Sequence, residues 1–264
     1  MIFAALSFCC IAVGGYFAFD AYPAASASAA LRSGGMVQRI IESFAGVSAH
    51  VPFWTMLGAV VYSFISITLI HYYFEKTQSP EILFIGFFVI SLAFEFARII
   101  IPLKWVFNFP SLYLITASRV LLFGRYFGLF SLFVASVYAA GLDTQKQQNI
   151  IFTLVMAALI VALNVPVDSL VWDSSLRNVN SYNSMFVMVE AGILAFTILT
   201  FFVSAYTRGS RAYVFIGIGI LLVFTGRNLL IKSDTWITPL PGLIILSVGT
   251  WLVSSRLHKE YLWL

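Results

Sequence analysis

Eight long runs of apolar residues constrain the fold of this chain more than any other feature. Each run is close to the length of about 20 residues at which an α-helix crosses the hydrocarbon core of a bilayer. A backbone in lipid must satisfy its own hydrogen bonds, so each run is expected to be helical. The runs cover residues 2–19, 51–74, 82–102, 112–140, 149–166, 185–206, 212–231 and 239–257.

The composition of the 264-residue chain supports the same interpretation. Hydrophobic residues make up 61% of the chain and charged residues only 10%, whereas a soluble domain has about 25% charged residues. Most connections between the runs are short, so consecutive helices are expected to be antiparallel neighbours. The sequence therefore predicts an all-α integral membrane protein, a polytopic antiparallel bundle of about eight transmembrane helices in one domain, residues 1–264.

The first run leaves two alternatives. Residues 2–19 and the small-residue stretch AYPAASASAA after them have features of a signal peptide and its cleavage site, but no basic residue precedes the run. We favour a retained helix; if it were cleaved, seven spans would remain. Residues 21–50 are expected to be a partly ordered extracytoplasmic loop with a short amphipathic helix in VQRIIESF, and residues 167–184 a loop that caps the bundle.

The distribution of lysine and arginine predicts the orientation. The densest basic segments, TRGSR at 207–211 and RLHK at 256–259, lie at helix ends on the side that also holds both termini. Basic loops favour the cytoplasmic side, so both termini are expected in the cytoplasm, with the protein in a membrane such as the bacterial inner membrane. The net charge of +4 comes from scattered single residues, so no nucleic-acid partner is predicted.

Ionisable residues inside the apolar runs are the strongest functional signal. Glu95 and Arg98 lie three residues apart in FEFARII, a spacing that puts both on one side of a helix, where they can pair. An ionisable group costs about 2.5–3.5 kcal/mol at the centre of a membrane helix, so such groups face the bundle interior and find partners. Alternating helix directions bring ionisable or amide groups from five runs to one level of the bilayer. The candidate ligand-binding residues are Glu95, Arg98, Arg119, Arg125, Glu190 and Arg227, with Asn164, Asp168 and Asn228 as secondary candidates.

Two interpretations of these charges stay open. The four arginines outnumber the two glutamates, and this excess is unfavourable unless an anion, water or a lipid headgroup completes it. Alternatively the network is purely structural, with Arg98 and Arg227 near enough to helix ends to extend to the interface. Arg119 and Arg125 point about 120° away from each other and need not share one site. Arg125 is the deepest charge in its run and the strongest single candidate.

Other motifs predict packing rather than chemistry. Gly124 and Gly128 have the GxxxG spacing that lets membrane helices approach closely. Gly217 and Gly219 also suggest close packing, and TPLPG at 238–242 suggests a helix start. The three histidines lie on different segments, so no metal site is predicted. No GxSxG, HExxH or P-loop pattern occurs, so no catalytic residue and no cofactor are assigned.

These observations favour a non-enzymatic membrane protein that senses a ligand or serves as an accessory subunit. Its expected partners are membrane lipids, an anionic small molecule and a partner membrane or cytoplasmic protein, because the short final segment LHKEYLWL offers no output domain. A small secondary transporter is the alternative, although the two halves of the chain show no internal repeat. A lipid-modifying intramembrane enzyme that uses Glu95 or Glu190 as acid or base ranks last.

Overall fold

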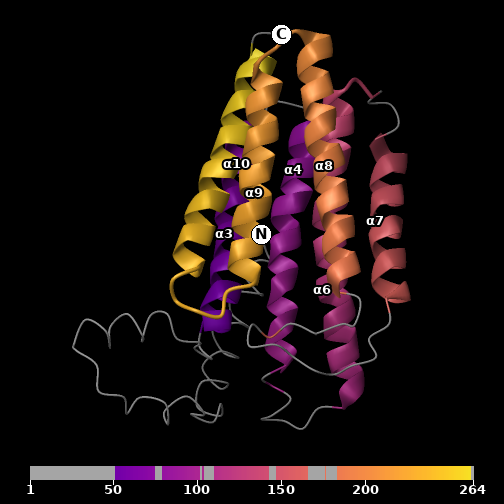
Figure 1. Cartoon of the computed structure of the whole chain (residues 1–264), viewed down its shortest axis with the longest axis vertical. Coiled ribbons are helices and arrows are strands. Elements are labelled where there is room, and N and C mark those ends of the chain that lie inside the picture. The colour runs from indigo at the N-terminus through magenta and orange to yellow at the C-terminus, as the bar shows by residue number, and fades with distance from the viewer. Residues whose placement is uncertain are drawn as a thin grey trace, which may run out of the picture.

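The computed structural model of the chain describes residues 51–74, 79–101, 103, 110–142, 147–165, 176 and 183–262. Within these ranges seven helices are long and apolar enough to span a membrane. They run up and down along one common axis (Figure 1). The predicted all-α membrane bundle is therefore confirmed, and its helices are compatible with an integral membrane location. The predicted first span at 2–19, the loop at 21–50 and most of the loop at 167–184 lie outside the described residues.

The helix bounds agree closely with the predicted spans, and two helices match them at both ends. The third span is the exception, because an α-helix covers its first part and a 3-10 helix, η2, its second part. TPLPG starts the last helix at Pro239, as predicted. The elements are α3 (Val51–Phe74), α4 (Pro80–Ser91), η2 (Leu92–Ile99), α6 (Ser111–Ala139), α7 (Gln147–Asn164), α8 (Asn183–Arg208), α9 (Ala212–Ile231) and α10 (Pro239–Leu262).

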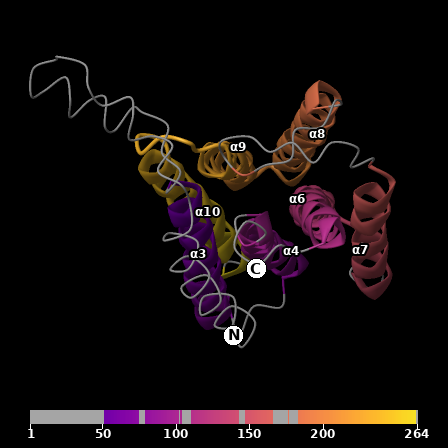
Figure 2. The same ribbon diagram turned by 90° about the horizontal axis from the view of Figure 1, so that it is seen from below.

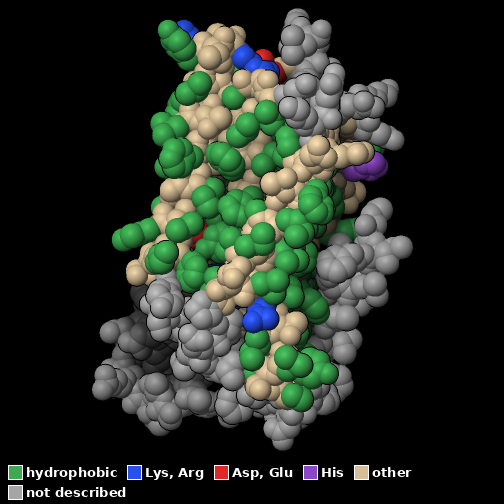
Figure 3. Space-filling view, turned by 90° about the vertical axis from the view of Figure 1, so that its right-hand side faces the viewer, with side chains coloured by type: hydrophobic (Ala, Val, Ile, Leu, Met, Phe, Trp, Pro, Cys, Tyr) green, Lys and Arg blue, Asp and Glu red, His purple; other side chains and the backbone are tan. Residues whose placement is uncertain are grey.

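The central element of the bundle is α4 with its continuation η2. Seen along the bundle axis, α3, α10, α9, α8 and α6 lie around α4, and α7 lies outside α6 (Figure 2). The span Pro80–Ile99 buries a larger share of its residues than any other described span. The helices α7 and α8 bury few residues, as expected of helices at the lipid-facing rim. One side of the bundle shows hydrophobic side chains over most of its height, with most of its visible described charges near the upper end (Figure 3).

Glycines in α6 set its distance from the central element. A Cβ atom added at Gly124 would lie 2.6 Å from the Cβ of Phe94, and one added at Gly128 would overlap the side chain of Ser91. The absence of a side chain at these positions lets α6 lie directly against α4 and η2. The predicted close contact of the GxxxG motif is confirmed.

Glycines also form the contact between α9 and α10, which is the most extensive helix pair in the described structure. A Cβ atom at Gly226 would lie 2.5 Å from the backbone nitrogen of Leu246. One at Gly249 would lie 2.8 Å from the backbone nitrogen of Val223. The two backbones therefore touch, and we call this contact the glycine seam. It includes two pairs with a seven-residue spacing, Gly219 with Gly226 and Gly242 with Gly249.

Candidate functional site

The 3-10 helix η2 places the two charges of FEFARII. A 3-10 helix has three residues per turn, so residues i and i+3 lie directly above each other. Glu95 and Arg98 have this spacing, and Nη2 of Arg98 forms an ion pair with Oε2 of Glu95. Their exposed fractions are only 5% and 1%. At eight residues, η2 is long for this helix type, since runs beyond three or four residues are uncommon and often mark a hinge or strain.

Arg98 also binds the end of α9. Its Nη1 donates a hydrogen bond of 3.1 Å to the carbonyl oxygen of Ile231, the last residue of α9. The last four carbonyls of a helix have no partner within the helix, and the helix dipole favours a cation there. Arg98 therefore connects η2 to α9 and satisfies polar groups on both.

The helix α6 brings Arg125 to the same carboxylate. Its Nε lies 3.9 Å from Oε1 of Glu95, and its side chain is 15% exposed. This Nε is buried without a hydrogen-bond partner among the described residues. Arg125 is thus less buried than Arg98, although it lies deeper in its apolar run. Position along a run sets depth in the membrane, whereas burial depends on which side of the helix faces the bundle.

Arg227 of α9 differs from the other arginines. Only 2% of its surface is exposed, and its Nε is buried with no hydrogen-bond partner in the part of the chain that the structure describes. The ion pairs between described residues involve Glu95 with Arg98 and Arg125, and leave Arg227 out. Glu190, Glu95 and Arg125 act on it electrostatically from a greater distance. Both Arg98 and Arg227 are buried inside the bundle.

Glu190 of α8 lies within electrostatic range of Arg227 on α9 and of Tyr126 on α6. Glu190 is half-buried. Tyr126 is buried, and its ring packs edge-on against Phe186 of α8. Tyr126 was not predicted from the sequence, although it directly follows Arg125 in GRYFG.

The structure does not bring all the predicted residues together. Arg119 is exposed on α6, on a different side of the helix from Arg125, in line with their spacing. Asn164 is exposed and donates a 2.8 Å hydrogen bond to a carbonyl of its own helix. Asn228 is half-buried beside Arg227 in sequence. Asp168 lies outside the described residues.

We call the remaining group the charged cluster: Glu95, Arg98, Arg125, Glu190 and Arg227. The three arginines and two glutamates leave one net positive charge. The end of α9 and the start of α8, which carry Arg227 and Glu190, lie toward the same end of the bundle, the lower end in Figure 1. Charges act more strongly on each other in such a low-dielectric interior than in water. This excess makes the cluster suited to an anion.

The cluster contains no residue set of the kind that binds metals. Among the described residues, no three His, Cys, Asp or Glu side chains lie together as a metal ion would require. No protein-family model matches the chain, and no curated protein is similar enough to it to count as a relative.

Proposed function

We propose that this protein binds an anionic group at the charged cluster and acts as a non-enzymatic ligand-sensing or accessory subunit in a membrane. The observation that supports this most strongly is the burial of Arg227 outside the described ion pairs, with its Nε lacking a hydrogen-bond partner among the described residues. A buried charge without a partner is strongly destabilising. An anion with oxygen acceptors, such as a carboxylate, a phosphate or a sulfate, would remove this penalty.

The residues around Arg227 define how such an anion would be held. Arg227 comes from α9 and Arg125 from α6, and the two guanidinium groups act on each other electrostatically. The Nε atoms of both arginines have no described hydrogen-bond partner. Glu95 and Glu190 limit the net charge of the cluster to +1. A single negative charge would therefore neutralise the cluster, which favours a monoanionic group over a highly charged one.

A partner chain would have its best access to this site through α8. The outer side of this helix exposes Met185, Met188 and Phe196, close in sequence to Glu190. Methionine side chains adapt to irregular apolar surfaces, so they suit contacts with another membrane helix. Because α8 carries both Glu190 and this apolar side, a shift of α8 on anion binding would change its contact with the partner chain.

The test uses Arg227→Gln with Arg119→Gln as the matched control, since Arg119 is an exposed arginine outside the cluster. The full chain is reconstituted in zwitterionic nanodiscs, and thermal unfolding is followed with added phosphate, sulfate or acetate. At an anion concentration of about 100 times Kd, the unfolding free energy of the wild-type protein and of Arg119→Gln should rise by about 2.7 kcal/mol. The unfolding free energy of Arg227→Gln should not change when the anion is added.

A second arm of this experiment distinguishes a free anion from a lipid headgroup. Nanodiscs that contain phosphatidic acid replace the soluble anions, and the same three proteins are compared. Stabilisation only in the phosphatidic acid nanodiscs identifies the ligand as a headgroup. If neither arm stabilises the wild-type protein more than Arg227→Gln, the proposed anion site is wrong.

Secondary transport is a second candidate function, and the 3-10 helix is the observation that favours it. Transporter sites often use membrane helices interrupted near the substrate, and η2 interrupts the regular α-helical geometry of the central span where Glu95 and Arg98 lie. Uptake of the stabilising anion into proteoliposomes, absent with Arg227→Gln, would support transport. Anion binding without uptake would support the sensor.

A further inference from the structure

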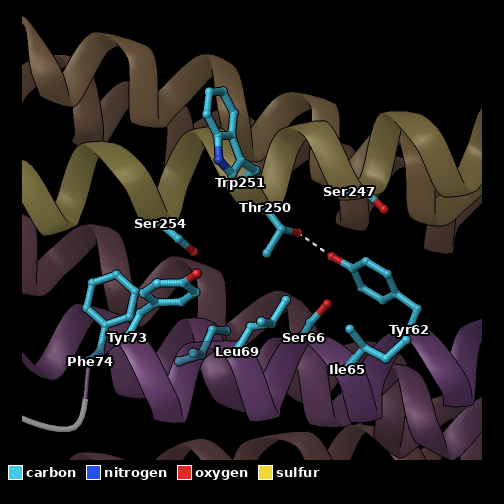
Figure 4. A pocket seen from close by; sticks show the side chains of 11 residues that line it. Tyr62, Ile65, Ser66, Leu69, Tyr73, Phe74, Ser247, Thr250, Trp251 and Ser254 are labelled. Atoms are coloured by element: carbon cyan, nitrogen blue, oxygen red, sulfur yellow. Dashed lines mark hydrogen bonds between the residues drawn. The ribbon is translucent and has the colours of Figure 1, made fainter.

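A groove lies between α3 and α10, away from the charged cluster. It has a volume of about 300 Å³ and is lined from both helices by the apolar side chains of Ile65, Leu69, Phe74 and Trp251, among others. The small hydroxyl side chains of Ser66, Ser247 and Ser254 also line it and leave room between the two helices (Figure 4). We call it the α3–α10 groove.

The polar groups at one end of the groove satisfy each other. The hydroxyl of Tyr62 is hydrogen-bonded to the hydroxyl of Thr250, as Figure 4 shows. Thr250 in turn donates a 2.9 Å hydrogen bond to the carbonyl of Leu246 in its own helix. This end of the groove therefore needs no polar ligand, and a hydrocarbon can lie against it without leaving these groups unpaired.

The length and direction of the groove match one leaflet of a bilayer. From Tyr62 to Phe74 the groove follows α3 over about 18 Å, at roughly 1.5 Å per residue. Half of the hydrocarbon core of a bilayer is about 15 Å. Tyr62 lies near the middle of α3 and Phe74 is its last residue. The groove therefore runs from the centre of the span to one membrane face, parallel to lipid chains.

The groove is too small to enclose a transmembrane helix. A helix with side chains is about 10 Å wide and rises about 5.4 Å per turn, so one turn occupies roughly 400 Å³. This exceeds the 300 Å³ of the whole groove. A single unbranched hydrocarbon chain is much narrower than a helix, and the small side chains of Ser66 and Ser254 line the groove.

We propose that the α3–α10 groove holds one acyl chain of a phospholipid, from the leaflet at the Phe74 end of α3. The chain would enter from that face, lie between α3 and α10, and end near the Tyr62–Thr250 hydrogen bond. This site is independent of the charged cluster, because its lining residues come from α3 and α10 and none belongs to the cluster.

The test is photocrosslinking of the full chain in vesicles of phosphatidylcholine that carries a diazirine at the middle of one acyl chain. Peptide mass spectrometry then compares labelling of Leu69 and Trp251 in the groove with labelling of Phe152 on α7 and Leu199 on α8. All four side chains are exposed apolar groups. An acyl chain held in the groove should label the two groove positions at least fivefold more than the two exposed positions outside it.

Ser254→Phe fills the groove, and Thr153→Phe, at an exposed position on α7, is the matched control. Ser254→Phe should abolish the excess labelling of Leu69 and Trp251 and leave Phe152 and Leu199 unchanged, whereas Thr153→Phe should keep the excess. Equal labelling of all four positions in the wild-type protein overturns the proposal, even if Ser254→Phe does not fold. Weaker labelling in the groove than on α7 and α8 also overturns it, since a protein segment would then exclude lipid.

Discussion

The two sides of α9 show two different ways of joining helices in a membrane. On one side, the glycine seam brings the backbones of α9 and α10 into contact, and a Cβ at Gly226 would lie 2.5 Å from the backbone of Leu246. On the other side, α9 is joined to η2 by the long side chain of Arg98, which binds the carbonyl of Ile231. The glycine seam leaves no space between the two backbones, whereas the side chain of Arg98 spans the distance between the backbones of η2 and α9.

This difference explains why the buried charges lie where they do. Close backbone packing, as in the glycine seam, excludes large side chains. Arginines need room and partners, so they gather where helices are held further apart. A contact made by side chains can also rearrange when a ligand provides new partners, while a contact between backbones cannot. The η2 side of α9 is therefore where binding and movement are expected.

Arg98→Gln is expected to lower the unfolding free energy more than any other substitution considered. This change removes the ion-pair partner of the buried Glu95 and the hydrogen bond to Ile231. Loss of one partner of a buried ion pair costs about 3–5 kcal/mol. Equilibrium unfolding in mixed micelles should show this loss, and Arg119→Gln should change the unfolding free energy by no more than about 0.5 kcal/mol. Equal stability of the two variants would contradict a structural role for Arg98.

Gly226→Ala tests the glycine seam between α9 and α10. The added methyl group would meet the backbone nitrogen of Leu246 at 2.5 Å and the carbonyl of Gly242 at 2.9 Å. Neither backbone atom can move without shifting α10, so overpacking should cost about 1–3 kcal/mol. Gly192→Ala on α8 is the control, since nothing lies within 4 Å of its added Cβ. If both variants unfold at the same denaturant concentration, the seam is looser than the structure indicates.

The sequence predicted the helices well because length and hydropathy are sufficient to define a membrane span. It did not predict which side of each helix faces inward. The runs are apolar all round, so their periodicity carries little information about the buried side. The seven-residue spacing of Gly219 with Gly226 and of Gly242 with Gly249 was present in the sequence, but only the structure shows that these glycines face each other.

The same limit applies to the charged residues. The i,i+3 spacing of Glu95 and Arg98 fits both an α-helix and a 3-10 helix, so the sequence suggested the pair but not η2. Arg125 was the strongest candidate because of its depth, while burial outside the described ion pairs distinguishes Arg227. Asn164 points outward because α7 packs mainly on α6. Burial depends on neighbours distant in the sequence, and a single sequence does not identify them.

Arg227→Met should change the unfolding free energy in the opposite direction to Arg98→Gln. Without an anion, the change removes a buried charge that has no ion pair among the described residues, and an apolar side chain of similar length fills its place. The unfolding free energy should rise by about 1–2 kcal/mol in zwitterionic nanodiscs. A loss of stability like that of Arg98→Gln would show that Arg227 is a structural member of the network.

Glu190→Gln should have the smallest effect on stability. Glu190 is half-buried and forms no ion pair with a described residue, so its loss should change the unfolding free energy by no more than about 0.5 kcal/mol. The net charge of the cluster would rise from one to two, so anion affinity should increase by up to about tenfold. A titration with the stabilising anion measures this increase. Weaker anion binding would mean that Glu190 orients Arg227 for the ligand, and the difference between the two sides of α9 would then depend on α8 as well.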